Sequence, residues 1–167
     1  EQNSYGRMRI LSGINPEGFS FALEPGQSFQ SPEAAMTYSD SGFGGVSSHM
    51  HAFVRRHIVR GHWADRERPV LLNSWEAAYF DINEKKLLKL AKEAKKCGIE
   101  LFVMDDGWFG KRNDDNCALG DWVVNEEKLS GGLKKLVDGV KAMGMKFGIW
   151  FEPEMISEDS DMYRAHP

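Results

Sequence analysis

The sequence lacks the features that mark several large classes of protein. Its two cysteines, Cys97 and Cys117, are too few for a disulfide-stabilised scaffold and form no C-x-x-C pair. No apolar run reaches the roughly 18 residues that a membrane-spanning helix needs, and no basic-then-apolar signal peptide opens the chain. Acidic residues outnumber basic ones by 25 to 21, without a basic stripe. These absences predict a cytoplasmic protein whose partners include neither a membrane nor nucleic acid.

What is present is ordinary for a globular protein. The chain is 41% hydrophobic, 28% charged and 11% aromatic. Its 167 residues correspond to about one domain, at roughly 150 residues per domain. The chain begins at Glu1 rather than at Met, and we therefore expect that an upstream portion preceded it.

The first 68 residues have two patterns. Residues 7–38 contain short alternating runs separated by Gly, Pro and Asn, which is typical of half-buried strands. Because two or three short strands are not stable alone, residues 1–40 are interpreted as the end of a larger β domain. Apolar residues then recur at helical spacing over residues 46–60, which predicts a linking helix and a connector within residues 41–68.

Residues 69–167 alternate between strand and helix patterns. Apolar runs at residues 69–75, 99–106 and 146–152 are suited to buried strands. Between them lie two amphipathic helices, the first capped by Asn83 and ended by Gly98, the second ended by Gly144 after a long loop over residues 107–131. This order predicts an α/β fold with a parallel sheet covered by helices.

Each predicted strand ends in carboxylates and tryptophan. The pairs are Trp75-Glu76, Asp105-Asp106 followed by Trp108, and Trp150 with Glu152. The carboxyl ends of parallel strands are where α/β proteins build their sites. Carboxylates accept hydrogen bonds from hydroxyl groups and indole faces pack against sugar rings, so this edge could form a carbohydrate subsite. A turn at Asp106-Gly107 with Trp108 in the core explains the same residues equally well.

Two other classes of function stay open on the residues alone. The chain could be a non-catalytic sugar-binding module. It could also be a metal-dependent barrel enzyme with Glu76, Asp106 and Glu152 as ligands on successive strands. A metal site on the linking helix is disfavoured, because the spacing of His51 and His57 does not place them on one face.

Four segments, taken together and in order, resemble the α-galactosidases of glycoside hydrolase family 36. They are RPVLLNSWEA at residues 68–77, LFVMDDGWFG at 101–110, LGDW at 119–122 and KFGIWFEPEM at 146–155. The resemblance implies that residues 1–40 are the C-terminal strands of a β-sandwich domain and residues 41–68 a linking helix and connector. Residues 69–167 would be the first three βα units of a (β/α)8 TIM barrel.

The resemblance also implies an activity and a set of site residues. The family hydrolyses terminal α-galactosyl groups, as in melibiose and raffinose, with retention and without metal or cofactor. Trp75, Asp105, Asp106 and Trp150 would bind the galactose. The catalytic nucleophile and acid/base are aspartates on later strands, so the chain is expected to be an inactive fragment of an enzyme that forms a homo-oligomer. A galactosyl-transferring relative or an α-N-acetylgalactosaminidase is a close variant.

Overall fold

The computed structural model describes residues 2 and 4–166 of the chain. They form two compact units, Glu1–Arg66 and Glu67–Pro167, and each is described here by itself. Within the described part of the chain, no helix combines the length and the apolar character that crossing a bilayer requires.

The first unit begins with a long segment that has no regular strand. Among the described residues before Gly42, pairing is limited to one isolated antiparallel bridge between Gln2 and Met8. The strands predicted over residues 7–38 are therefore wrong for this chain. A strand persists only where a neighbouring strand pairs with its backbone over several residues, and the described residues of this segment form that single bridge and no such ladder. That residues 1–40 belong to a β domain stays a prediction.

A helix follows, as the apolar spacing predicts. The α-helix α1 spans Gly42–Phe53 and continues through the π-helical turn η1, Val54–Ile58, before the short 3-10 helix η2 at Gly61–Trp63. The helix begins about four residues earlier than the predicted residue 46. None of its side chains is buried.

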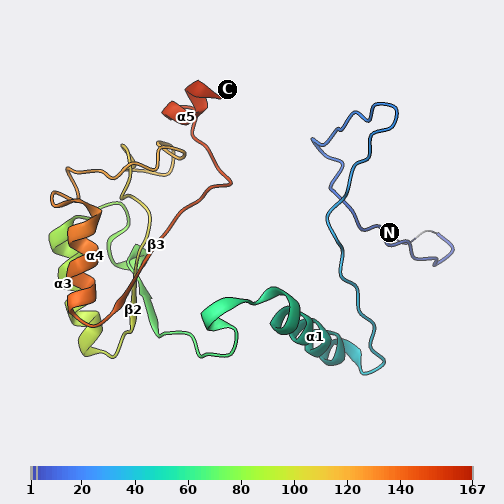
Figure 1. The fold of residues 1–167 in the computed structure, drawn as a ribbon, viewed down its shortest axis with the longest axis horizontal. Helices are drawn as coiled ribbons and strands as arrows, with labels where there is room; N and C mark the ends of the chain where they lie inside the picture. Colours follow the sequence, from blue (N-terminus) through green and yellow to red (C-terminus); the bar gives the residue numbers. More distant parts are fainter. Residues whose placement is uncertain (1, 3, 167) are drawn as a thin grey trace. The chain divides into compact units, whose positions relative to one another are not determined.

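The second unit contains a parallel sheet with two covering helices. The strands are β1, Leu71–Asn73, β2, Leu101–Met104, and β3, Lys146–Ile149, in the order β1-β2-β3. The helices α3, Glu84–Lys96, and α4, Gly132–Ala142, connect them and lie side by side along the sheet (Figure 1). The predicted alternation of strands and helices is confirmed, although the hydrogen-bonded strands are shorter than the apolar runs.

Local chemistry explains why the helices begin and end where they do. The side chain of Asn83 accepts a hydrogen bond from the Lys86 N–H and so caps α3. Gly98 has a φ of +84°, a left-handed conformation that ends this helix at low cost. Leu87 of α3 and Leu136 of α4 are fully buried, which places the predicted apolar faces against the core.

The sheet has a buried face and an open face. In β2 the side chains of Phe102 and Met104 are fully buried, whereas those of Leu101 and Val103 are partly exposed. Because side chains alternate along a strand, every second residue faces the helices and the others face away from them. The residues just after β2 continue from these two faces and lead into the site.

Two further helices are too short to be predicted from periodicity. They are α2, Trp75–Ala78, directly after β1, and α5, Asp161–Ala165. The first matters for the site because it carries Trp75.

Candidate functional site at the carboxyl end of the sheet

Three polar or aromatic residues stand at the carboxyl ends of the three strands. Asn73 ends β1, Asp105 follows β2 and Trp150 follows β3. The Trp150 N–H donates to the Met104 carbonyl oxygen at 3.0 Å, which keeps the end of β3 next to the end of β2. The parallel sheet therefore brings Asp105 and Trp150 to one edge, as the sequence predicts, and places Asn73, which was not predicted, beside Asp105.

Asn73 links the two parts of this edge. Its side-chain amide donates to a carboxylate oxygen of Asp105, and its side-chain carbonyl accepts the backbone N–H of Trp75 at 2.7 Å. The Ser74 hydroxyl accepts the N–H of Asp105 at 3.0 Å. The end of β1 thus orients both Trp75 and Asp105.

The neighbouring carboxylates Asp105 and Asp106 lie in different environments. Asp105 is partly exposed, whereas Asp106 is only 4% exposed. The difference follows from alternation, because Asp106 continues the buried face of β2 and Asp105 the open one. Asp105 is therefore the more accessible of the two to a ligand.

The carboxylate of Asp106 is held by Arg112. The guanidinium donates through Nη2 to Oδ2 at 2.8 Å and through Nε to Oδ1 and Oδ2 at 3.1 and 3.0 Å. The Gly107 N–H donates to Oδ1 at 2.6 Å. Burial opposes the charge of Arg112, but the hydrogen bonds and negative charge of Asp106 outweigh it and raise the pKa of Arg112. Both oxygens of Asp106 already have donors within the chain.

The two tryptophans predicted to line a sugar site remain accessible. Trp75 and Trp150 are both partly exposed. Trp75 packs edge-on against Tyr79 and Phe80, with ring centroids 5.1 and 5.0 Å apart. Rigid aromatic neighbours fix the orientation of the Trp75 indole while leaving part of it open.

Trp150 belongs to a cluster of aromatic rings. The Trp108 indole N–H donates to the carbonyl oxygen of Trp150 at 3.0 Å. The ring centroids of Trp150 and Trp122 lie 6.4 Å apart. Trp108 is 2% exposed. Trp108 is thus a core residue, as the turn-and-core interpretation of this motif proposed, whereas Asp105 and Trp150 stay available.

The proposed metal ligands Glu76, Asp106 and Glu152 do not gather around a common point among the described residues. Within residues 2 and 4–166, no three His, Cys, Asp or Glu side chains gather as a metal ion would require, so Glu76, Asp106 and Glu152 form no such group. Glu76 instead accepts a hydrogen bond from the Tyr79 hydroxyl at 3.0 Å. This interaction raises the pKa of Tyr79.

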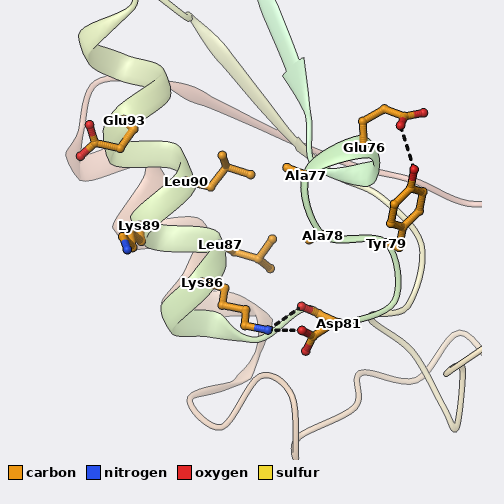
Figure 2. Close-up of a pocket in the computed structure, with 10 residues that line it drawn as sticks. All are labelled: Glu76, Ala77, Ala78, Tyr79, Asp81, Lys86, Leu87, Lys89, Leu90 and Glu93. Atoms are coloured by element: carbon orange, nitrogen blue, oxygen red, sulfur yellow. Dashed lines mark hydrogen bonds and ion pairs between the residues drawn. The ribbon is translucent and has the colours of Figure 1, made fainter.

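Two cavities lie away from the four residues predicted to bind galactose. One, of about 420 Å³, opens between α2 and α3 and is lined by residues from Glu76 to Glu93 (Figure 2). The other, of about 670 Å³, lies between the loop after β2 and the segment leading into α5. None of Trp75, Asp105, Asp106 and Trp150 lines either cavity.

Sequence reasoning missed three residues that build this edge. Arg112, Lys128 and Asn73 make the contacts that hold the strand ends. Only Asn73 gave a signal, since it lies in a strand-end motif. Arg112 and Lys128 lie in the loop over residues 107–131, whose path no periodicity reveals.

A family model described as Melibiase matches residues 28–167 of the chain. The chain belongs to the melibiase family. The chain is 51% identical over 167 residues to the alpha-galactosidase AgaA of Geobacillus stearothermophilus, a match that covers all of this chain and 23% of that protein. It is 53% identical to the bifunctional alpha-galactosidase/sucrose kinase AgaSK of Mediterraneibacter gnavus, covering 18% of it.

Solved structures agree with the sequence comparison. The crystal structure of the GH36 alpha-galactosidase AgaA from Geobacillus stearothermophilus matches this chain with a TM-score of 0.84 and 53% identity. The match covers 93% of this chain and 22% of the AgaA chain. The alpha-galactosidase from Lactobacillus brevis matches all of this chain and 22% of its own, with a TM-score of 0.86 and 50% identity.

These findings confirm the resemblance to GH36 alpha-galactosidases and the predicted fold class. The three parallel strands with α3 and α4 are part of a (β/α)8 barrel. The chain spans about a fifth of the length of the curated relatives that it matches.

Proposed function

We propose that this chain is a segment of a retaining α-galactosidase and supplies part of the galactose-binding site of that enzyme. One observation carries the proposal. Asp105, Trp75 and Trp150 stand accessible at the carboxyl ends of parallel strands in a chain that is 51% identical throughout to an alpha-galactosidase. That edge is where barrels of this kind bind substrate.

The chemistry of these residues suits a galactosyl group. Each oxygen of the Asp105 carboxylate accepts one hydrogen bond within the chain, from the Asn73 amide and from the Asp106 N–H, and keeps a second lone pair for a sugar hydroxyl. The two partly exposed indoles offer apolar faces to the ring. AgaA variants have been crystallised with stachyose and with raffinose. We propose oligosaccharides that end in an α-galactosyl group as substrates. A galactosyl-transferring relative or an α-N-acetylgalactosaminidase is the close variant of this proposal.

The segment contributes no catalytic pair in this proposal. A retaining glycosidase needs two carboxyl groups about 5 Å apart across the scissile bond, one as nucleophile and one as acid/base. Asp106 cannot readily serve, because it is buried and Arg112 and the Gly107 N–H together donate twice to each of its oxygens. The proposed role of Asp106 in binding galactose is consequently weaker than that of Asp105, and we place the nucleophile and the acid/base elsewhere in the longer enzyme.

We further propose a cytoplasmic location and a homo-oligomeric longer enzyme. Both cysteines are free thiols, which supports a reducing compartment. The oligomer rests on the family resemblance alone, and the mass of the longer enzyme in solution tests it.

Substitution of Asp105 tests the binding role in the longer enzyme. Asp105→Asn removes charge-assisted hydrogen bonds to the sugar, so kcat/KM for p-nitrophenyl α-D-galactopyranoside should fall by about 10- to 100-fold. Asp138→Asn is the matched control, because Asp138 lies exposed on α4 and pairs with the exposed Lys134. Equal activity of the Asp105 variant and the control would overturn the proposed role.

A further inference from the structure

The loops that follow β1 and β2 approach each other very closely. Gly107 has a φ of +90°, and a Cβ placed on it would lie 3.3 Å from the Cα of Phe80. The first loop carries Trp75, and the second carries Asp105 and Asp106. The relative position of these residues therefore depends on what holds the two loops together.

Lys128 binds both loops through its ammonium group. The Nζ atom donates to the carbonyl oxygens of Phe80 at 3.1 Å, Gly107 at 2.9 Å and Arg112 at 2.9 Å. An ammonium has three N–H donors, and three acceptors are present. Burial lowers the pKa of Lys128. The group is thus placed within the protein rather than in solvent.

Arg112 connects the same two loops through its side chain. Besides the Asp106 carboxylate, its guanidinium lies 5.5 Å from the ring centroid of Phe80, and its Nη1 donates to the Cys117 carbonyl oxygen at 2.9 Å. The Phe80 ring packs edge-on against Trp75. An unbroken series of contacts leads from Asp106 through Arg112 and Phe80 to Trp75.

We infer that Arg112 and Lys128 are positioning residues that fix the sugar-binding tryptophan Trp75 relative to the carboxylates after β2. This inference rests on the proposed function. Neither cation needs to touch the sugar, because each acts through Phe80 and the backbone around Gly107. We call these two residues the cation clamp.

The chemistry of the two cations makes them poorly interchangeable. Arg112 uses a planar fork to bind one carboxylate twice and stack on a ring, which a lysine cannot reproduce. Lys128 uses three divergent donors on three carbonyls, which a methionine of similar length leaves unpaired. Arg112→Lys and Lys128→Met are therefore sharp tests.

Amide hydrogen exchange of the longer enzyme tests the clamp without a substrate. In Lys128→Met, peptides covering residues 75–80 and 105–112 should both exchange at least about tenfold faster, since charged hydrogen bonds of this kind hold them. Lys111→Met is the control, because Lys111 is an exposed neighbour in the same loop. Acceleration of only one loop, or of neither, would overturn the clamp.

Kinetics then test whether the clamp acts through Trp75. Arg112→Lys should lower kcat/KM for p-nitrophenyl α-D-galactopyranoside by about tenfold or more, with KM raised, while Arg164→Lys leaves it unchanged. In a Trp75→Phe background the loss caused by Arg112→Lys should shrink by at least half. Additive losses would show a general structural role and overturn the inference.

The two proposals can fail separately. An inactive wild-type enzyme on every α-galactoside tried would contradict the proposed function, whereas the exchange experiment would still decide whether the clamp joins the loops. If the wild-type enzyme is active but the losses caused by Arg112→Lys and Trp75→Phe are additive, the clamp alone is contradicted.

Discussion

Asp106 and Arg112 form a buried ion pair in which each partner depends on the other. Their side chains are 6% and 3% exposed, and the guanidinium meets the carboxylate through two nitrogens. Taking two charges out of water is costly, and their attraction and hydrogen bonds offset that cost only while both are present. The pair fixes the loop after β2 more than it adds net stability.

Removal of one partner should expose this dependence. Arg112→Met leaves a buried carboxylate without its cation and should lower the free energy of unfolding by about 3–5 kcal/mol. Urea unfolding followed by tryptophan fluorescence measures the loss. The double variant Asp106→Leu/Arg112→Met should recover most of it, and a double variant as unstable as the single one would contradict this account.

The Tyr79 phenol should lose its proton at a higher pH than a free tyrosine, because Glu76 raises its pKa. The phenol donates to the Glu76 carboxylate, and this hydrogen bond and the nearby negative charge raise the pKa of Tyr79 above the usual 10.0. The raised pKa means that the fold favours the neutral phenol. The resulting stabilisation is complete below pH 10.0 and is lost as the pH rises through the folded-state pKa.

Ultraviolet titration at alkaline pH checks the Tyr79 prediction. The chain has four tyrosines, so the difference between the wild type and Tyr79→Phe isolates the signal of Tyr79. In Glu76→Gln that signal should appear at lower pH than in the wild type. An unchanged midpoint would show that Glu76 does not control this phenol.

At the scale of single residues, the sequence predicts which side chains reach the site better than what they bind there. Trp75, Asp105 and Trp150 follow three parallel strands, whose carboxyl ends lie at one edge. The predicted burial of these strands holds for β2 but not for β1 or β3. Arg112 could not be paired with Asp106, because that contact depends on how the loop over residues 107–131 folds back. Arg112 lies in a loop, where no strand or helix period determines which side chains meet.

At the scale of elements, the approach of the loops after β1 and β2 requires a glycine. Gly107→Ala would place a Cβ 3.3 Å from the Phe80 Cα in a left-handed conformation. The conformation alone costs about 1–2 kcal/mol. Gly98→Ala is the matched control, with a φ of +84° and open space around it.

Thermal or urea unfolding of the two glycine variants separates the effects. Both should be destabilised by the left-handed conformation, and Gly107→Ala should lose measurably more because the backbone of Phe80 cannot give way as a flexible side chain can. Equal losses would show that the loops have room to separate.

The elements themselves were predictable to different degrees. Asn83 and Gly98 define α3 because capping and left-handed residues act locally, within one turn. The runs over residues 7–38 alternate like strands, yet no strand forms there, because pairing needs a partner that local pattern does not reveal. The helices α2 and α5 are four and five residues long, too short to show a helical period.

At the scale of the whole molecule, the two units contribute differently. The buried core, including Phe102, Met104, Leu87 and Leu136, lies in Glu67–Pro167. No described residue of the first unit is buried. The second unit therefore supplies the hydrophobic stabilisation and the site, whereas the proposed β domain of residues 1–40 is still a prediction.

The barrel geometry explains why a binding edge can exist without catalysis. A complete (β/α)8 barrel closes with eight strands and typically about 250 residues. Three strands, in the order β1-β2-β3, build one part of the ring of strand ends. In the proposed α-galactosidase, the residues at these strand ends would bind the substrate, and carboxylates from other strands of the longer enzyme would supply catalysis.

The most direct test of this division between binding and catalytic residues is galactose release from p-nitrophenyl α-D-galactopyranoside. It is measured for the 167-residue chain and for the longer enzyme at equal molar concentration. The account predicts that the longer enzyme releases galactose and that the 167-residue chain releases none above background. Release by the 167-residue chain that is abolished by Asp106→Asn would contradict it, because the catalytic carboxylates would then lie within this segment.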